Sequence, residues 1–378
     1  MKKSLPLSYI EISRQNLIHN VKAFRSLIKR GTKIAVVIKG NAYGHGQNIV
    51  AKILDPYADY FFVNSIEELE LLRKVSVKKV LLLGYVQREN LTQTIKLGCI
   101  LAVFSIKQLR EINKIAGNLK VRQEVHIPVD AHLGREGFLI NELSSLFMEI
   151  KKSKNIRFSG IYAHFANIED TRDFSHARKQ IKEYQKALKT AGEFGFKNLQ
   201  THISSTSGIL VYEKGGGIHP LVRLGISVYG MWPSEHLKLL YKNKIKLYPL
   251  LSWKTKVAEV KILPKGHTVG YGLTYIAKRE TKIALIPQGY SDGLDRGLSN
   301  KGEVLIRGTR CRIIGRVSMN MFVADVSHLP KVEIEDEAVI IGTQGKEKIT
   351  AEEIAKRLGT INYEITARIN PLLPRVVI

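Results

Sequence analysis

The stretch Val36-Val37-Ile38-Lys39-Gly40-Asn41-Ala42-Tyr43-Gly44-His45-Gly46 decides how the rest of the chain is interpreted. The apolar run from Ile34 to Ile38 predicts a buried strand, and Lys39 follows it directly, before a loop punctuated by glycines. A lysine held in such a dry place has a lowered pKa and becomes an amine that can condense with a carbonyl group. Lys39 is therefore a candidate for Schiff-base chemistry, with Tyr43 and the loop amides as candidate phosphate ligands. The alternative is a strand that ends at the surface, with Lys39 as an ordinary charge.

The same stretch resembles the pyridoxal-phosphate attachment site of the alanine racemase family, whose pattern is Val-Lys-Ala-Asn-Ala-Tyr-Gly-His-Gly. Ile38 and Gly40 stand where the family usually has Val and Ala. The resemblance implies that the chain uses pyridoxal 5'-phosphate as a cofactor, with Lys39 as its covalent attachment point and Tyr43 as a phosphate contact.

Composition restricts the class of protein. The chain has 378 residues, enough for two domains or for one barrel with an appendage, and 44% of them are hydrophobic. Its two cysteines, Cys99 and Cys311, are too few for a disulfide framework, and no run of eighteen apolar residues predicts a membrane span. We therefore expect a cytoplasmic protein without a membrane partner.

The formal net charge of +25 raises the question of a nucleic-acid partner. The lysines and arginines are spread over nearly every segment, without an interleaved aromatic and basic tract or a recognition-helix pattern. A lysine-rich surface is the simpler interpretation, and we expect no nucleic-acid partner.

Apolar strand-like runs alternate with amphipathic helical patterns in the first two thirds of the chain. Eight strands alternating with helices imply right-handed crossovers and a parallel sheet, and eight is the number that closes a barrel. We predict a (β/α)8 barrel over residues 1–242. The predicted strands are Ile34–Ile38, Tyr60–Val63, Val80–Leu83, Leu101–Phe104, Val125–Val129, Gly160–His164, Gln200–Ser204 and Val222–Val228.

The pattern changes after about Lys242 to short strands separated by turn residues, with no helix between them. This predicts a mostly antiparallel β domain over residues 243–378. One late helix, Ala351–Leu358, is predicted to begin at Thr350 with Glu353 completing a capping box.

Polar residues recur where the predicted barrel strands end, which is where barrels gather functional groups. Ser205 and Thr206 offer hydroxyls, and Gly225 and Ile226 offer backbone amides, to a phosphate near the seventh and eighth strands. No metal site is predicted.

Two further polar residues can act on a planar cofactor. His164 can stack on a flat heterocycle. Arg223 lies on an apolar strand, so its charge needs a partner. If that partner is a pyridine nitrogen, the very high pKa of arginine keeps the nitrogen unprotonated and makes the ring a weaker electron sink.

The resemblance to alanine racemases extends over nearly the whole chain. It implies that Arg223 contacts the pyridine nitrogen and that Tyr271, reaching in from the partner subunit of a homodimer, is the second catalytic base opposite Lys39. It also implies that Arg135, Leu133, Met319 and Tyr290 bind the substrate. The matching segments are Ile161–Ala166, Val222–Gly230, Val269–Gly272, Gly289–Gly293 and Gly315–Asn320.

Acting as a base near neutral pH would require the pKa of Tyr271 to fall by about 3 units, or about 4 kcal/mol. Nearby cations are the plausible source of such a shift. Arg135 and the His164–Arg223 pair are the candidates.

Some positions depart from the family pattern. Pro128 stands where some members carry a carbamylated lysine that buttresses the arginine equivalent to Arg135, and His132 replaces a glycine beside the substrate carboxylate. Thr206 replaces a phosphate-binding serine, Asn320 an aspartate, and Pro371 lies near the place of another phosphate-contacting tyrosine.

The resemblance implies a racemase that interconverts L- and D-alanine by two bases and supplies D-alanine for peptidoglycan. Two alternatives remain open. One is a related racemase with a different or broader specificity, for serine or basic amino acids, for which His132 and Asn320 are the basis. The other is a non-catalytic pyridoxal-phosphate carrier, against which the Tyr271 segment counts.

Overall fold

The computed structural model describes residues 5–213 and 218–378, which divide into two units. The barrel unit comprises residues 16–40, 47–213 and 218–248, and the β unit comprises residues 5–15, 41–46 and 249–378. The N-terminal residues and the segment after Lys39 therefore lie in the β unit, although we expected them in the barrel.

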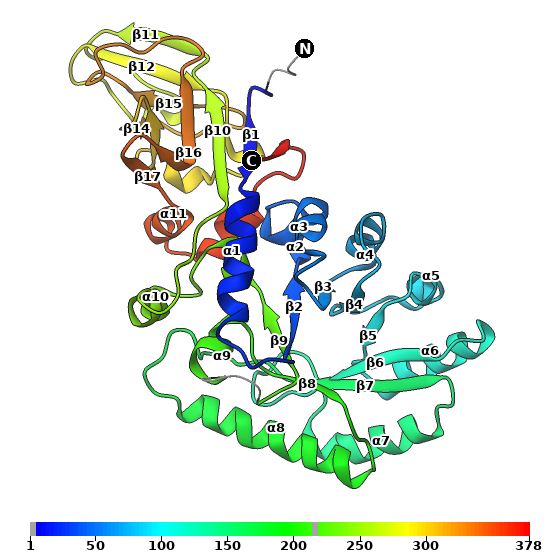
Figure 1. Ribbon diagram of the computed structural model, residues 1–378. Coiled ribbons are helices and arrows are strands. Elements are labelled where there is room, and N and C mark those ends of the chain that lie inside the picture. Colours follow the sequence, from blue (N-terminus) through cyan, green and yellow to red (C-terminus); the bar gives the residue numbers. More distant parts are fainter. Residues whose placement is uncertain (1–4, 214–217) are drawn as a thin grey trace. The chain divides into compact units, whose positions relative to one another are not determined.

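Eight parallel strands form the predicted barrel, which is confirmed (Figure 1). They pair in the order β8-β7-β6-β5-β4-β3-β2-β9. The backbone N–H of Arg223 donates to the carbonyl of Ser204 at 3.0 Å and so brings the last strand against the end of β8. The strands are β2 (Lys33–Val37), β3 (Tyr60–Val63), β4 (Lys79–Leu82), β5 (Ile100–Ala102), β6 (Gln123–Pro128), β7 (Ile156–Tyr162), β8 (Gln200–His202) and β9 (Leu221–Leu224).

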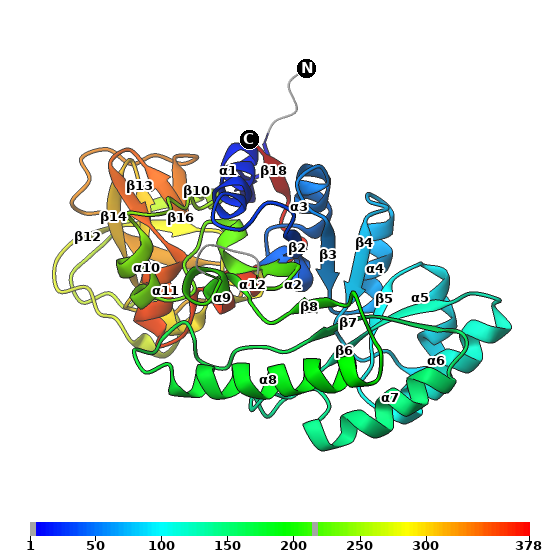
Figure 2. The same cartoon turned by 60° about the horizontal axis from the view of Figure 1, so that its bottom comes forward.

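Helices connect these strands and lie on the outer side of the barrel (Figures 1 and 2). Local sequence explains where they begin: Ser65 and Ser105 accept hydrogen bonds from the third residues of α4 and α6, as N-cap residues do. The helices of this unit are α1 (Arg14–Arg25), α3 (Gln47–Leu54), α4 (Ile66–Arg73), α5 (Leu91–Lys96), α6 (Ile106–Asn118), α7 (Leu143–Lys152), α8 (Ser175–Glu193), α9 (Thr206–Val211) and α10 (Glu235–Tyr241).

The eighth barrel strand is shorter than predicted. It ends at Leu224, and Ile226–Tyr229 forms the 3-10 helix η3 where the sequence predicts a continuing strand. Gly225 turns the chain, and its N–H donates to the hydroxyl of Thr206 at 3.2 Å. The apolar residues after Gly225 are buried against the barrel, which is why they imitate a strand in the sequence.

The β unit is mostly antiparallel, as predicted, with one parallel pair between β1 and β18. The strands are β1 (Tyr9–Ile12), β10 (Leu251–Lys256), β11 (Glu259–Leu263), β12 (Thr281–Ile286), β13 (Glu303–Ile306), β14 (Thr309–Ile314), β15 (Phe322–Asp325), β16 (Glu337–Gln344), β17 (Glu347–Ile349) and β18 (Arg375–Val377).

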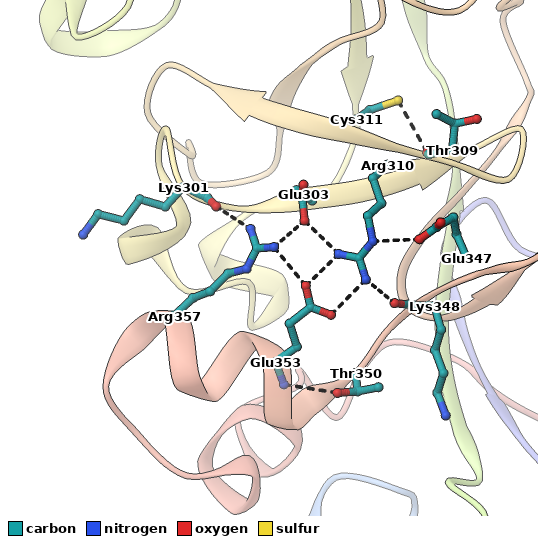
Figure 3. Close-up of polar contacts among 10 residues, drawn as sticks. All are labelled: Lys301, Glu303, Thr309, Arg310, Cys311, Glu347, Lys348, Thr350, Glu353 and Arg357. Carbon is teal, nitrogen blue, oxygen red and sulfur yellow. Dashed lines mark hydrogen bonds and ion pairs between the residues drawn. The ribbon is translucent and has the colours of Figure 1, made fainter.

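The late helix α11 (Ala351–Leu358) has the predicted bounds, and Thr350 caps it by accepting from the N–H of Glu353 at 3.1 Å. In a capping box, the Glu353 carboxylate would accept from the backbone N–H of Thr350. It binds Arg310 instead, so the predicted capping box is only half formed (Figure 3). A second helix, α12 (Asn362–Ala367), was not predicted.

Arg310 is the centre of an ion-pair network in the β unit, drawn in Figure 3. Its guanidinium binds the carboxylates of Glu303 on β13 and Glu347 on β17, each at 2.8 Å, in addition to Glu353 on α11. Arg357 completes the network by binding Glu303 and Glu353. One side chain on β14 therefore joins a hairpin, a neighbouring strand and a helix.

Candidate functional site

Lys39 directly follows Ile38, which is fully buried at the end of β2, and its own side chain is half-buried. Within the described ranges, its amine has neither a hydrogen bond nor an ion pair. Burial, and then the charge of Arg135, lower its pKa, and Glu136 and Glu68 oppose this shift. The amine is therefore more readily deprotonated than that of an ordinary lysine, as a nucleophile or a base requires.

The residues after Lys39 form a left-handed turn, α2 (Lys39–Tyr43). Gly40, Asn41, Ala42 and Tyr43 have φ between 52° and 61°. Left-handed backbone is costly for Ala42 and Tyr43, and such strain is common at functional sites.

Contacts within each unit hold this turn in place. In the barrel unit, the Glu68 carboxylate accepts from the N–H of Gly40 at 2.6 Å and from that of Asn64 at 2.7 Å. In the β unit, the Tyr43 ring lies 6.0 Å from that of Tyr363, and Arg375 donates to the Gly44 carbonyl at 2.9 Å.

Arg223 is a buried cation on β9. Its Nη2 donates to His164 Nδ1 at 2.9 Å and to the carbonyls of Ala163 and Ile203, and its Nη1 donates to His202 Nδ1 at 3.1 Å. Burial lowers its pKa to about 10, so it keeps its charge at neutral pH. Among the described residues, Nε–H and one Nη1 hydrogen have no acceptor, so Arg223 can still donate to a ring nitrogen.

The protons of Arg223 determine the tautomers of two buried histidines. His202 Nδ1 must accept, so its proton is on Nε2, which donates to His126 Nδ1 at 3.2 Å. Burial lowers the pKa of His126 to about 3 and, with the charge of Arg223, that of His202 well below its ordinary value. Both rings are therefore neutral, and the donation from Arg223 fixes which nitrogen of each ring donates and which accepts.

His164 is also held as a neutral acceptor. Burial, and then the charge of Arg223, lower its pKa well below the ordinary value. Its Nδ1 accepts from Arg223, so the proton lies on Nε2.

The four predicted phosphate ligands of the barrel are close together in the fold. The hydroxyl of Thr206 accepts from Gly225 N–H and so joins the turn at Ser205–Thr206 to the turn at Gly225–Ile226. Thr206, Gly225 and Ile226 are buried, and Ser205 is half-buried. The Thr206 hydroxyl accepts in this bond and keeps its own proton to donate.

The loop after β6 carries the predicted carboxylate-binding arginine. Arg135 is exposed and forms a two-point ion pair with Glu136, whose Oε1 lies 2.8 Å from Nη2. The N–H of Leu133, expected to serve a substrate, donates instead to Asp130 Oδ1 at 2.8 Å. His132, expected beside the substrate, has its Nε2 4.0 Å from Glu183 on α8.

The donor set of the barrel fits an anionic, planar cofactor. The charges of Arg135 and Arg223 lower the pKa of Lys39, and the charge of Arg135 also lowers that of Arg223. The carboxylates of Glu136 and Glu68 oppose the effect on Lys39. A phosphate and a carboxylate would balance the excess of positive charge. The amine of Lys39 is the group that an aldehyde requires, and the unpaired guanidinium hydrogens of Arg223 are the donors that a ring nitrogen requires.

Tyr271 lies in the β unit, at the start of the 3-10 helix η4 (Tyr271–Leu273), and is 74% exposed. It stands between Gly270 and Gly272, both with φ of 72°. A Cβ on Gly272 would come within 2.8 Å of the Arg316 guanidinium carbon, so this cation packs against the turn that presents the tyrosine.

Tyr290 and Met319 lie on two segments of the β unit that are joined by backbone hydrogen bonds. The N–H of Tyr290 donates to the Ser318 carbonyl at 3.1 Å, and that of Ser291 donates to the Met319 carbonyl at 2.9 Å. Asn320 donates to the Ser291 hydroxyl at 2.7 Å. Both predicted substrate side chains remain largely exposed.

Four site residues were not predicted: Glu136, Glu68, His126 and His202. For the two histidines, the available signal was that each lies in a predicted barrel strand, where a buried polar group needs a partner. No group of three or more His, Cys, Asp or Glu suited to a metal was found in residues 5–213 and 218–378. In the same ranges, no helix is long and apolar enough to cross a membrane.

Two family models cover nearly the whole chain. The model described as "Alanine racemase, N-terminal domain" matches residues 12–233, and "Alanine racemase, C-terminal domain" matches residues 250–377. The chain belongs to the alanine racemase family.

Individual relatives agree with this family. The chain is 35% identical, over 98% of its length, to the "Alanine racemase" of Leptospira interrogans serovar Lai, of which it covers 96%. Among solved structures, it matches the Bacillus anthracis alanine racemase "with bound L-Ala-P" at 31% identity and a TM-score of 0.93, covering 99% of this chain and 96% of that one. It also matches the Bartonella henselae enzyme "with covalently bound pyridoxal phosphate" at 25% identity and a TM-score of 0.85, covering 99% of this chain and all of that one.

Proposed function

We propose that this chain is a pyridoxal-phosphate-dependent racemase that interconverts L- and D-alanine. The observation that carries the proposal is the amine of Lys39, placed at the end of a barrel strand with its pKa lowered by burial and by Arg135. The family assignment and the relatives named above support alanine as the substrate. The enzyme would act in the cytoplasm and supply D-alanine for peptidoglycan.

The residues of the barrel divide the work of holding the cofactor. Lys39 would bind its aldehyde carbon, and Arg223 would donate to its ring nitrogen. Ser205, Thr206, Gly225 and Ile226 would hold its phosphate with Tyr43, and His164 would lie against the ring. When bound, pyridoxal phosphate supplies a carbonyl for the amino group and a ring that accepts the electron pair left on the α-carbon.

Arg223 would limit how strongly the cofactor ring withdraws electrons. Its guanidinium remains charged at neutral pH, because a pKa of about 10 is still well above 7. It would therefore donate a hydrogen bond to the ring nitrogen without giving up its own proton. A weaker electron sink favours return of a proton to the α-carbon over side reactions such as transamination.

Racemisation requires a proton to leave one face of the α-carbon and another to arrive on the opposite face. Lys39 would move the proton on the D side, with its freed amine as base. Tyr271 of the partner subunit would move the proton on the L side, and its 74% exposure suits a residue that serves a second chain. Each homodimer would then contain two composite sites.

The substrate carboxylate would bind Arg135, because the guanidinium is exposed and offers donors that its ion pair leaves unused. Tyr290 and Met319, which lie on hydrogen-bonded neighbouring segments of the β unit, would line the substrate position. Leu133 stays a predicted substrate contact, although its N–H donates to the Asp130 carboxylate.

Exchange of the α-proton in deuterated water, followed by NMR, tests the proposal. L-alanine, D-alanine, L-serine and L-lysine are compared with wild type and with Tyr271→Phe. We expect wild type to exchange and invert both alanine enantiomers and Tyr271→Phe to lose inversion from the L side. Faster inversion of serine or lysine would indicate a different specificity, and cofactor binding without inversion of any amino acid would indicate a carrier.

A further inference from the structure

Glu136 holds one edge of the Arg135 guanidinium. Nε donates to Oε2, and Nη2 donates to Oε1 at 2.8 Å, so the carboxylate occupies the edge of the guanidinium formed by Nε and Nη2. A guanidinium has five N–H donors in a fixed plane. The edge formed by Nη1 and the second Nη2 hydrogen stays available for another carboxylate.

Backbone hydrogen bonds join the two ends of the loop that carries this pair. Asp130 N–H donates to the Phe138 carbonyl, and Phe138 N–H donates to the Pro128 carbonyl, both at 3.0 Å. Gly137 has φ of 121°, and a Cβ there would come within 2.5 Å of Asp130 N. The backbone on both sides of Arg135 and Glu136 is thus tied to the end of β6.

The charges of both residues act on Lys39. The charge of Arg135 lowers the pKa of Lys39, and the charge of Glu136 raises it. Burial alone would raise the pKa of Glu136, but the hydrogen bonds and charge of Arg135 outweigh burial and lower it. The Glu136 side chain is 31% exposed and that of Arg135 is 60% exposed, so the carboxylate is the more enclosed partner.

The residue that ends β6, before this loop, cannot hold the guanidinium through its side chain. Pro128, the last residue of β6, has an apolar side chain without charge, donor or acceptor. We propose that Glu136 is the positioning residue of Arg135: its carboxylate holds the Nε and Nη2 edge, so that the Nη1 edge is preset to bind the carboxylate of the amino-acid substrate. This proposal rests on the racemase function proposed above.

Loss of this support should weaken substrate binding. An arginine without Glu136 samples many rotamers, and the substrate must then order it on binding. A carboxylate contact is made in the ground state and in the transition state alike, so its loss appears in KM more than in kcat. For Glu136→Gln we expect KM for L- and D-alanine to rise about tenfold, with kcat within about threefold of wild type.

The chain provides a matched control. Arg110 and Glu149 form the same two-point pair, with Nε–Oε1 of 3.0 Å and Nη2–Oε2 of 2.8 Å, between α6 and α7. Their side chains are 64% and 18% exposed, which is comparable to the Arg135–Glu136 pair. Glu149→Gln should therefore leave both KM values at the wild-type level.

A second readout does not depend on turnover. Protein without cofactor is labelled with 15N-arginine, and Arg135→Lys identifies the Nε–H signal of Arg135 by its disappearance. In wild type this signal should exchange slowly with solvent, because Nε–H is bonded to Glu136. Glu136→Gln should shift it and increase its exchange rate, and Glu149→Gln should change only the signal of Arg110.

The inference would be overturned if the KM of Glu136→Gln equalled that of wild type. A KM below the wild-type value would also overturn it, because it would mean that Glu136 competes with the substrate. An unchanged Arg135 signal in that variant would overturn it as well. Failure of the proposed function is seen separately, as absence of inversion in wild type, and leaves the NMR comparison of Arg135 intact.

Discussion

At the scale of single residues, the site depends on groups that are kept neutral or charged by burial. Lys39 loses affinity for its proton because burial and Arg135 act in the same direction. Arg223 keeps its proton in a dry place because arginine begins from a very high pKa. The histidines around it are neutral, so they accept hydrogen bonds from Arg223 without adding positive charge.

Gly160 shows how closely this cluster is packed. A Cβ on Gly160 would lie 2.4 Å from the ring of His126. We expect Gly160→Ala to lower the free energy of unfolding by about 2 kcal/mol, because neither strand can move apart without breaking the sheet. Urea denaturation measures the change.

The control for this prediction is Gly192→Ala on α8, where a Cβ meets no atom within 4 Å. There we expect a gain of up to about 1 kcal/mol from helix propensity. Equal effects of the two substitutions would contradict the close packing at His126.

The buried histidines predict loss of stability in acid. His126 has a folded pKa of about 3 and His45 one of about 4, below the ordinary 6.5. The unfolded chain therefore binds protons that the folded chain does not, and the unfolding free energy falls as the pH falls from about 6.5 towards these values. Each group contributes up to about 1.4 kcal/mol per pH unit in that window.

His126→Phe checks this assignment. The variant should be less stable at pH 7, but its unfolding free energy should fall less steeply between pH 6.5 and pH 4.5, by up to about 1.4 kcal/mol per pH unit. Urea titrations at several pH values give the slope, and a slope equal to that of wild type would show that His126 does not contribute.

At the scale of elements, the barrel strands could be predicted because each is a short apolar run between helical patterns. The end of β9 could not, because Ile226–Tyr229 is as apolar as the strand before it, and the turn is seen only in the hydrogen bonds of the folded chain, such as that from Gly225 N–H to Thr206. Glu136 looks like any surface glutamate in the sequence. Its role depends on where the loop after β6 closes, and that is a tertiary property.

The Arg310 network is the connection between elements with the largest expected effect on stability. Arg310→Met would leave Glu303, Glu347 and Glu353 close together without their shared cation. The side chain of Arg310 is 29% exposed, so solvent reduces the cost, and we expect a loss of about 2 kcal/mol. Thermal or urea unfolding measures it.

Arg110→Met serves as the comparison for this network. Arg110 binds only Glu149, and its side chain is 64% exposed. Its loss should cost at most about 1 kcal/mol. If the two substitutions destabilise the chain equally, the network adds nothing beyond a single surface pair.

At the scale of the whole molecule, the proposed dimer makes a sharp prediction about mixed subunits. Lys39→Ala and Tyr271→Ala homodimers should each be inactive. After the two proteins are unfolded together and refolded, each mixed dimer should contain one site with both Lys39 and Tyr271 intact. Random pairing then restores about a quarter of wild-type racemase activity. No recovery would mean that both residues act within one chain.

The two-unit division was predictable from the change in pattern near Lys242, but the composition of the β unit was not. β1 is a short apolar run just before α1, and nothing local to it shows that its partners are Leu251–Lys256 and Arg375–Val377. The assignment of Asn41–Gly46 to the β unit depends likewise on contacts with residues more than 300 positions away, such as Arg375 and Thr366. Long-range pairing of this kind leaves no periodic signal in a single sequence.

The pairing of β1 with both β10 and β18 has a consequence for synthesis of the protein. Ile10 is synthesised long before its neighbour in the sheet, Arg375. At about 5 to 20 residues per second, translation leaves the edges of β1 unpaired for tens of seconds. An apolar strand with open edges can pair wrongly with other chains. Ribosome-bound chains should therefore depend on chaperones that cover β1 until β18 has emerged.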